Sequence, residues 1–366
     1  MIKARNFDAE IMERVIALAG RGSYTTGSNP RVGSIIAKGG EVLAEGWHRK
    51  PGEAHAEIAA LEKSGDRARG SDLYVNLEPC VNFGLTPPCV PALIAAGIRR
   101  VVIAMKDPNP TVSGRGISAL EAAGIDVTVG VGEKSARELN QGFVMRMTTG
   151  RPFVRLKLAA TIDGRTAAPN GSSQWITSQE ARQDVHHWRA LSDAVVTGIG
   201  TIESDNPRLN ARVDAEVMQP LRVVVDSDGR LDDDVSLFSV EGPILLVTSR
   251  DMEDAKSRLD DSVELIKLRG ENERVDLVAL VIELGDRGKN EVLIEAGAKL
   301  AGAFVEAGLV DEYLVYFAPD LLGDQGRGMF VLPDIDELNN RVTLEILEIR
   351  RLGRDLCLRL RAVDRI

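Results

Sequence analysis

The sequence predicts an α/β protein of two domains, a three-layer α/β sandwich over residues 1–150 and a second α/β unit with a mixed sheet over residues 151–366. The length of 366 residues is about twice that of a typical domain of ~150 residues. In both parts, short apolar runs alternate with stretches of helical periodicity, which is typical of α/β folds. The stretch Thr149-Gly150-Arg151-Pro152 combines helix-breaking residues and predicts the boundary between the domains.

The first domain is expected to begin with a helix over 8–20 and a hairpin over 33–47. Within the hairpin, Gly39 and Gly40 favour a tight turn between two β-rich runs, Gly33–Ala37 and Glu41–Trp47. Helices and strands then alternate, which favours parallel pairing. We expect helices over 54–63, 88–97, 117–123 and 133–147, and strands over 72–77, 100–105 and 125–131.

The second domain is expected to begin with an apolar strand over 153–160. A helix over 178–191 follows, and Thr177-Ser178 before Glu180 predicts its N-cap. The acidic stretch 226–234 is typical of a loop. In the tail, apolar and polar residues alternate as in half-exposed antiparallel strands. The remaining expected elements are strands over 193–197, 221–226, 244–248, 291–295, 311–318, 342–350 and 355–361, and helices over 275–284 and 299–307.

The composition excludes several classes of protein. Hydrophobic residues make up 44% and charged residues 27% of the chain, which are ordinary values for a globular protein. The first 150 residues carry 18 Lys and Arg against 16 Asp and Glu, so no basic surface predicts nucleic-acid binding. No stretch approaches the roughly 18 apolar residues that a membrane span requires, and the N-terminus lacks the apolar core of a signal peptide. We therefore expect a cytoplasmic protein with no membrane or nucleic-acid partner.

The three cysteines are an odd number in a long chain, which argues against a disulfide framework and leaves metal or core roles, and any metal site must draw on them and on four histidines. His55, Cys80 and Cys89 form a suitable tetrahedral zinc set that leaves the fourth position for water, as in catalytic zinc sites. Glu57 is the candidate carboxylate for proton transfer. Because residues two apart do not share a helix face, His55 and Glu57 can converge only at a helix end. The alternative is a surface histidine, a common acidic residue and two unrelated core cysteines.

A longer set of motifs gives a family resemblance. His-x-Glu followed by Pro-Cys and a second Cys is the signature of zinc nucleobase deaminases, although here eight residues separate the cysteines. The pattern resembles the N-terminal domain of the bifunctional riboflavin biosynthesis enzymes, in which a pyrimidine deaminase is fused to a reductase. The residues that carry this resemblance are Leu77, Glu78, Pro79, Cys80, Gly84, Thr86, Pro87, Pro88 and Cys89, together with 29–33, 45–48, 107–110 and 114–116.

This resemblance covers nearly the whole chain and implies a cytidine-deaminase-like sandwich. It implies one Zn²⁺ per chain on His55, Cys80 and Cys89, with Glu57 as the catalytic residue. It also implies that Asn29 and His48 line the pyrimidine or phosphate pocket, although Asn29 before a proline is equally typical of a simple turn.

The loop after the first cysteine departs from the family. Relatives usually have Ser-His-x-Gly followed by Arg or Lys, whereas this chain has Val81-Asn82-Phe83-Gly84-Leu85. The metal ligands are retained, but a histidine and a basic side chain are missing. We therefore expect the zinc chemistry to persist and the contacts with an anionic substrate to be weaker.

No Gly-x-Gly-x-x-Gly fingerprint occurs after residue 150. The segments 156–165 and 173–177 instead resemble the riboflavin-pathway reductase, which implies a dihydrofolate-reductase-like domain that uses NADPH. Lys157 and Glu295 are the ionisable residues expected nearest the reacting carbon. Without the family, they are equally typical of a strand-end charge and a helix N-terminal acid. The resemblance assigns substrate binding to Ser173, Arg189, Leu209 and Arg212, and cofactor binding to Trp175, Thr177, Thr201, Asp205 and Gly297.

The leading hypothesis is a bifunctional enzyme of riboflavin biosynthesis. It deaminates a diaminopyrimidinone ribosylamino phosphate and then reduces the ribosyl group to ribityl. Its partner is thus a small pyrimidine ribosyl phosphate, and we expect a homo-oligomer. One alternative is a paralogue that acts on a related pyrimidine. Another is an active reductase whose first domain holds zinc only for structure. Cys357 is predicted to be a core residue, and His186-His187 to be a surface feature.

Overall fold

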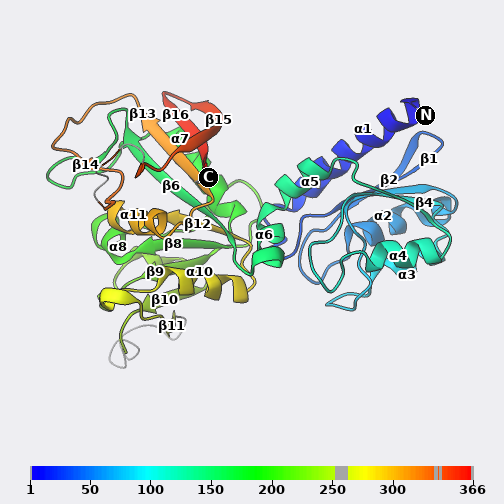
Figure 1. Cartoon of the computed structure of the whole chain (residues 1–366), viewed down its shortest axis with the longest axis horizontal. Coiled ribbons are helices and arrows are strands. Elements are labelled where there is room, and N and C mark those ends of the chain that lie inside the picture. The colour runs from blue at the N-terminus through cyan, green and yellow to red at the C-terminus, as the bar shows by residue number, and fades with distance from the viewer. Residues whose placement is uncertain (1, 252–262, 334–336, 338–339, 364–366) are drawn as a thin grey trace. The chain divides into compact units, whose positions relative to one another are not determined.

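A computed structural model of the chain describes residues 2–251, 263–333, 337 and 340–363. The chain divides into two compact units, Met1–Gly150 and Arg151–Ile366. Each unit contains a main sheet with helices packed against it (Figure 1). Within the residues described, no helix is long and apolar enough to cross a membrane.

The first unit is built on a five-stranded sheet in the order β2-β1-β3-β4-β5. The predicted hairpin is confirmed, since β1 and β2 pair antiparallel and Gly39 and Gly40 have φ values of 61° and 87°. Strand β1 also pairs antiparallel with β3, whereas β3, β4 and β5 are parallel. The strands are β1 (Gly33–Lys38), β2 (Glu41–Trp47), β3 (Asp72–Leu77), β4 (Arg100–Met105) and β5 (Asp126–Val129).

Helices cover both faces of this sheet, which confirms the three-layer sandwich. Neighbouring strand residues point to opposite faces. Ile35 accordingly packs with Met12 and Phe143 in one hydrophobic cluster, and Ile36 packs with Leu93 in the other. The helices are α1 (Ile2–Ala19), α2 (Ala56–Ser64), α3 (Cys89–Ala95), α4 (Arg115–Ala122), α5 (Glu133–Leu139) and α6 (Gln141–Thr149), with 3-10 turns η1 (Gly20–Gly22) and η2 (Gly65–Ala68).

The prediction of one helix over 133–147 is wrong, because the chain forms two helices that meet at Asn140. Asn140 has φ −111° and ψ 25°, outside the α-helical region. Its side chain accepts a hydrogen bond from the Arg31 amide at 2.8 Å and donates one to the Arg31 carbonyl at 3.0 Å. This two-point contact fixes the loop that carries Asn29, and it provides a physical reason for the break.

The second unit is built on a nine-stranded mixed sheet in the order β11-β10-β9-β8-β12-β6-β13-β16-β15. The strands from β11 to β13 are parallel to one another, and β16 and β15 continue the sheet antiparallel. The strands are β6 (Phe153–Thr161), β8 (Ala194–Gly198), β9 (Leu221–Val225), β10 (Ile244–Thr248), β11 (Val263–Lys267), β12 (Glu291–Glu295), β13 (Glu312–Ala318), β15 (Leu344–Leu352) and β16 (Asp355–Ala362).

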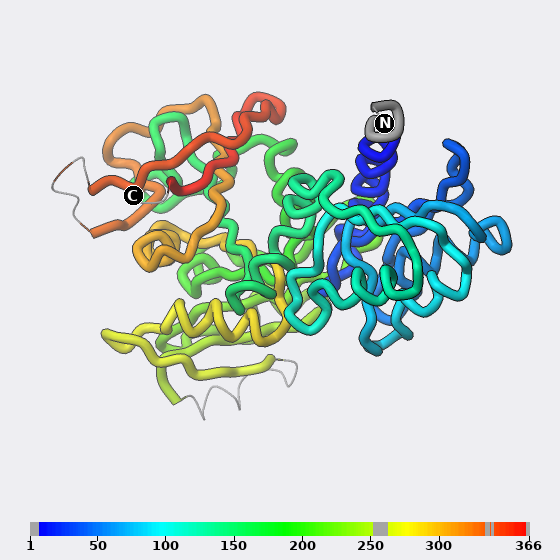
Figure 2. Tube along the Cα trace, turned by 45° about the vertical axis from the view of Figure 1, so that its right-hand side comes forward, coloured from blue at the N-terminus to red at the C-terminus, as the bar shows by residue number. Residues whose placement is uncertain are grey.

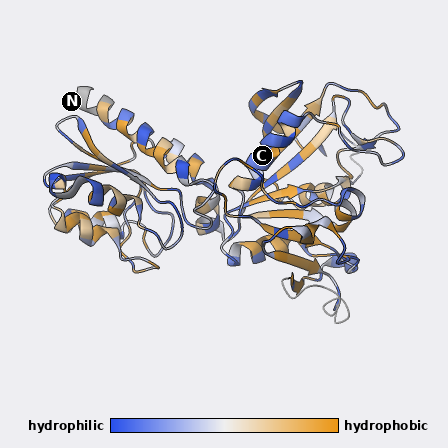
Figure 3. Cartoon of the chain, turned by 180° about the vertical axis from the view of Figure 1, so that it is seen from behind, coloured by the Kyte–Doolittle hydropathy of each residue, from blue (hydrophilic) through white to orange (hydrophobic). Residues whose placement is uncertain are grey.

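Two hydrophobic clusters cover the two faces of this sheet, and Figure 3 shows hydrophobic residues along its central strands. Helices α10 and α11 contribute Leu280 and Phe304 to one cluster, and α7 and α8 contribute Val185 and Ile202 to the other. Ser178 caps α7 by accepting from the Ala181 amide, as predicted. The helices are α7 (Gln179–Leu191), α8 (Ile199–Asp205), α10 (Leu277–Asp286) and α11 (Ala298–Glu306), with 3-10 turns η3 (Ser236–Ser239) and η4 (Glu271–Glu273).

The tail differs in part from its prediction. Strand β13 pairs antiparallel with β16, as predicted, but it also pairs parallel with β6 and is almost fully buried, so the prediction of half-exposure is wrong there. Figure 2 shows this orange segment between green β6 and the red C-terminal strands. The sequence did not predict β11, nor the short pair β7 (Arg165–Ala167) and β14 (Arg327–Gly328). Strands of two or three residues are too short to show an alternation of apolar and polar residues, so the sequence does not indicate this pair.

Candidate active sites

A histidine and two cysteines meet at one edge of the first sheet. His55 is the N-cap residue of α2, Cys80 follows β3, and Cys89 is the first residue of α3. The Nδ1 atom of His55 lies 3.2 Å from Sγ of Cys89 and 3.5 Å from Sγ of Cys80. Tetrahedral Zn–N and Zn–S bonds separate their nitrogen and sulfur atoms by about 3.5 Å. The three side chains therefore fit a zinc ion.

Glu57 lies beside these ligands because the helix begins at the required residue. His55 has extended φ and ψ of −66° and 159°, while Glu57 lies in the first turn of α2. The two side chains can thus approach the same point, because they lie at a helix end, as the sequence requires for them to converge. Glu57 is 3% exposed, and its carboxylate lies near the Cys89 thiol. Burial raises its pKa, and the neighbouring Cys80 raises it further.

The environment favours a thiolate at Cys80. A hydrogen bond from the Cys89 side chain lowers the pKa of Cys80 to about 4, although burial opposes the shift. The backbone amide of Cys89 also donates to Sγ of Cys80 at 3.4 Å. A thiolate is the form of cysteine that binds metal, so the site is electrostatically prepared for a cation.

The carboxylate of Glu78 fixes the loop around the first cysteine. Its two oxygens accept four backbone N–H groups, those of Asp107, Gly114, Gly116 and Ile117, at 2.9 to 3.2 Å. A Cβ on Gly116 would lie 2.2 Å from the carbonyl oxygen of Pro79, so only glycine allows this close approach. These contacts hold the backbone immediately before Cys80.

The two residues expected in the pyrimidine pocket lie together beside the metal ligands. Asn29 Nδ2 is 3.0 Å from His48 Nε2, and the His48 ring lies 5.5 Å from the His55 ring in an edge-on arrangement. Burial lowers the pKa of His48, which favours its neutral form. In the loop that departs from the family, Phe83 and Leu85 are 82% and 84% exposed.

In the second unit, three charged side chains gather at the carboxyl end of β12, beside the middle of β6. Lys157 and Glu295 are direct neighbours in the parallel pairing. The Arg189 guanidinium forms two hydrogen bonds to the Glu295 carboxylate, at 2.5 and 2.9 Å, and Lys157 Nζ lies 4.0 Å from it. Burial lowers the pKa of Lys157. Burial alone would raise the pKa of Glu295, but Arg189 and Lys157 outweigh it and lower that pKa.

The other expected substrate residues lie near this cluster or on the loop beside it. Arg212 is exposed and donates to Asn210 Oδ1 at 2.8 Å, while Arg189 donates to the Asn210 carbonyl. Leu209 is buried with φ 57°, a left-handed conformation that is rare for leucine. The hydroxyl of Ser173 donates to Asp205 at 3.2 Å.

The expected cofactor residues fall into two groups. A Cβ on Gly297 would lie 3.9 Å from Thr201 Oγ1, so those two positions are neighbours. Trp175 is 70% exposed, and the Arg182 guanidinium lies 4.6 Å from its ring centroid. Arg182 also donates to the Thr177 carbonyl. Arg182 thus joins Trp175 to Thr177.

The prediction that His186 and His187 are only a surface feature is wrong for His186. His187 is exposed, but His186 is half-buried, and burial together with Arg189 and Arg212 lowers its pKa to about 4. One turn of α7 therefore brings His186 and Arg189 to the same cluster. The spacing of three residues is the signal in the sequence that could have indicated this. Cys357, by contrast, is buried in the core as predicted.

Known proteins resemble the chain over both units. The family model described as the cytidine and deoxycytidylate deaminase zinc-binding region matches residues 5–105, and that of the RibD C-terminal domain matches residues 152–358. The riboflavin biosynthesis protein RibD of Escherichia coli (strain K12) is 44% identical over 365 residues, which cover 96% of this chain and 99% of that protein. RibD of Haemophilus influenzae is 41% identical over 97% of this chain and 98% of its own length.

Solved structures give the same result. RibD of Acinetobacter baumannii superposes with a TM-score of 0.92 at 40% identity and covers 98% of this chain and 100% of its own. A diaminohydroxyphosphoribosylaminopyrimidine deaminase/5-amino-6-(5-phosphoribosylamino)uracil reductase of Thermotoga maritima superposes with a TM-score of 0.88 at 31% identity, with the same coverage. The similarity therefore includes the complete arrangement of elements in both units.

Proposed function

Because the chain belongs to the RibD family of bifunctional deaminase–reductases of riboflavin biosynthesis, we propose that it acts on two successive pyrimidine ribosyl phosphates. Its first unit hydrolyses the 2-amino group of 2,5-diamino-6-ribosylamino-4(3H)-pyrimidinone 5′-phosphate and releases ammonia. Its second unit then reduces the ribosyl group to ribityl. The main support is the approach of His55, Cys80 and Cys89 to within 4.8 Å of one another, with the Glu57 carboxylate beside them.

In the deaminase unit, His55, Cys80 and Cys89 would hold one Zn²⁺ per chain. When bound, zinc lowers the pKa of a water molecule towards neutrality. Glu57 accepts the proton of the attacking water and returns it to the departing amine. A carboxylate placed beside the reacting group is one of the usual groups for proton transfer of this kind. A purely structural zinc site would require a fourth protein ligand, whereas the cluster found among the described residues has three.

In the reductase unit, NADPH would supply the hydride. Arg189 and Lys157 hold the Glu295 carboxylate at the carboxyl end of β12, next to the expected reacting carbon. Arg212 binds the substrate phosphate through its exposed guanidinium. Thr201, Asp205 and Gly297 lie at or next to the ends of α8 and α11 and contribute to the cofactor site.

Two assays test this assignment. Purified protein is incubated with the diaminopyrimidinone substrate, and ammonia release is measured without a nicotinamide cofactor. The deaminated intermediate is then supplied with NADPH or NADH, and its conversion to the ribitylamino product is followed by mass spectrometry. We expect ammonia in the first assay and NADPH-dependent product in the second. Failure to deaminate with zinc present would contradict the proposed substrate.

Replacing Arg212 with Ala should weaken binding of the reductase substrate by about 10- to 150-fold. The reason is the loss of a charged hydrogen bond to phosphate, worth about 1.5 to 3 kcal/mol. Arg189→Ala should also lower kcat, because it releases the Glu295 carboxylate. The substrate KM, the NADPH KM and kcat are measured for both variants, with Arg361→Ala on the exposed side of β16 as the control. An unchanged substrate KM in Arg212→Ala would remove Arg212 from the phosphate site.

Cytoplasmic location and homo-oligomeric state stay predictions. Neither follows from the fold of one chain. Size-exclusion chromatography with light scattering would measure the oligomeric state, and cell fractionation would test the location.

A further inference from the structure

The second ring nitrogen of His55 contacts a threonine. While Nδ1 of His55 faces Sγ of Cys80 and Sγ of Cys89, its Nε2 lies 3.0 Å from the hydroxyl oxygen of Thr86. Thr86 lies in the loop between the two cysteines, and it is less exposed than the four residues before it. The imidazole is therefore contacted through both of its nitrogens.

The chemistry of metal binding determines the direction of this hydrogen bond. A neutral imidazole that offers the Nδ1 lone pair to a metal carries its proton on Nε2. The Nε2–H group must then donate, and the Thr86 hydroxyl oxygen is placed to accept. Such a bond fixes both the tautomer and the rotation of the ring, and it makes the histidine a better ligand.

The short segment from Thr86 to Cys89 contacts the His55 ring at both of its ends. Thr86 accepts from one side of the ring, and Cys89, three residues later, lies at the other side. Pro87 and Pro88 connect them, and each proline has a restricted φ. Pro88 is the N-cap residue of α3, with φ −67° and ψ 149°, so the segment continues directly into a helix. The Gly84 amide also donates to the Thr86 carbonyl at 3.2 Å.

We propose that Thr86 is a positioning residue of the zinc site, whose hydroxyl accepts from Nε2–H of His55 and holds Nδ1 towards the metal. This role depends on the proposed zinc site and adds a residue to it that does not touch the metal. It also gives a function to a loop that lacks the family's usual histidine and basic residue. Thr86 acts on metal affinity, whereas the exposed residues before it face solvent.

The test compares Thr86→Val, which removes the hydroxyl at nearly constant shape, with Thr86→Ser, which retains it. Zinc affinity is measured by competition with a chromogenic chelator. Loss of a partner of this kind weakens metal binding by about 10- to 100-fold, which is the result expected for Thr86→Val. Thr86→Ser should restore most of the affinity. The matched control is Thr148→Val on α6, whose hydroxyl donates to carbonyls of its own helix.

Because Thr86 lies in the first unit, the thermal unfolding transition of that unit is compared among the variants to show that each remains folded. Zinc affinity in Thr86→Val equal to that of Thr148→Val would overturn the proposal, and so would equal losses in the Val and Ser variants. A parallel Cys80→Ser variant distinguishes failure of the proposed zinc site from failure of the proposed role of Thr86. If Cys80→Ser retains full zinc affinity, the metal site itself is wrong. If Cys80→Ser loses zinc and Thr86→Val does not, only the role of Thr86 fails.

Discussion

Replacing Glu57 with Gln is expected to lower the deaminase kcat by about 100- to 10,000-fold, the usual contribution of a positioned general acid–base group. The amide keeps the size of the side chain but cannot accept and return a proton. Glu57 is buried in the first turn of α2, beside the ligands but outside the three-residue metal set. Zinc content and reductase activity should therefore be retained. Ammonia release, metal content and NADPH oxidation are measured on the same preparation.

The control for this variant is Glu62→Gln, the same substitution at an exposed position of the same helix. It should leave all three measurements unchanged. Ammonia release at the parent rate in Glu57→Gln would remove Glu57 from the mechanism. Loss of zinc in Glu57→Gln would instead show that the carboxylate holds the metal.

Replacing Arg155 with Leu should destabilise the reductase unit by about 3 to 5 kcal/mol, the cost of removing one partner from a buried ion pair. Arg155 on β6 has a side chain that is 4% exposed, and it pairs with Glu291 on β12 and Glu312 on β13. Its guanidinium also lies 5.1 Å from the Trp188 ring centroid. The substitution leaves two buried carboxylates without this positive charge.

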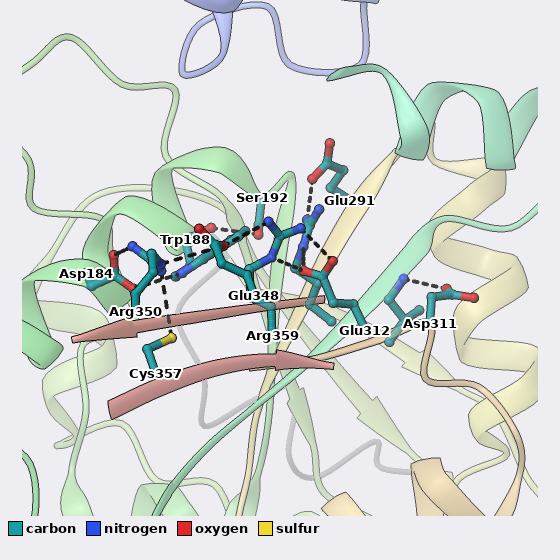
Figure 4. Close-up of polar contacts among 12 residues, drawn as sticks. Asp184, Trp188, Ser192, Glu291, Asp311, Glu312, Glu348, Arg350, Cys357 and Arg359 are labelled. Carbon is teal, nitrogen blue, oxygen red and sulfur yellow. Dashed lines mark hydrogen bonds and ion pairs between the residues drawn. The ribbon is translucent and has the colours of Figure 1, made fainter. Parts of the chain in front are cut away.

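Neighbouring contacts extend this network across the sheet (Figure 4). Arg359 on β16 donates to Glu312 at 2.8 Å and to Glu348 on β15 at 3.2 Å. Glu312 would retain Arg359 in the variant, so Glu291 is the group whose environment changes most. Burial of an acidic group without its cation raises its pKa and favours the protonated form.

Scanning calorimetry measures this effect, because it resolves the transitions of two units that unfold separately. A loss of 3 to 5 kcal/mol corresponds to a decrease in Tm of about 6 to 20 °C for a domain of this size. The control is Arg361→Leu, which removes an exposed arginine from β16. A reductase transition as stable in Arg155→Leu as in that control would show that the buried charges contribute no stability.

The elements with uniform local patterns could be predicted from the sequence. Strands β3, β4, β10 and β12 are continuous or nearly continuous apolar runs, and their bounds agree with the structure. The break at Asn140 could not be predicted, because it depends on a contact with Arg31, 109 residues away in sequence. The burial of β13 likewise follows from its position between β6 and β16. Long-range pairing of this kind leaves little trace in a local window of sequence.

In the candidate sites, too, some features follow from the local sequence and others depend on contacts made in the fold. His55, Cys80 and Cys89 were visible in the sequence because zinc requires nitrogen and sulfur ligands, and few residues could supply them. The hydroxyl of Thr86 was visible only as part of a motif, since its role depends on where the second nitrogen of His55 points. His186 differs from its neighbour His187 in lying one helical turn from Arg189, but its burial near Arg212 depends on the tertiary fold.

A single time course that measures both reactions in one preparation tests whether the chain deaminates its substrate before reducing it. Zinc-loaded protein is given the diaminopyrimidinone substrate and NADPH, and ammonia release and NADPH oxidation are followed together. We expect one ammonia released per NADPH oxidised. A chelator that removes zinc should stop both signals, and addition of the deaminated intermediate should restore NADPH oxidation alone. NADPH oxidation that continues from the diaminopyrimidinone after zinc removal, with no ammonia released, would contradict the order of deamination before reduction.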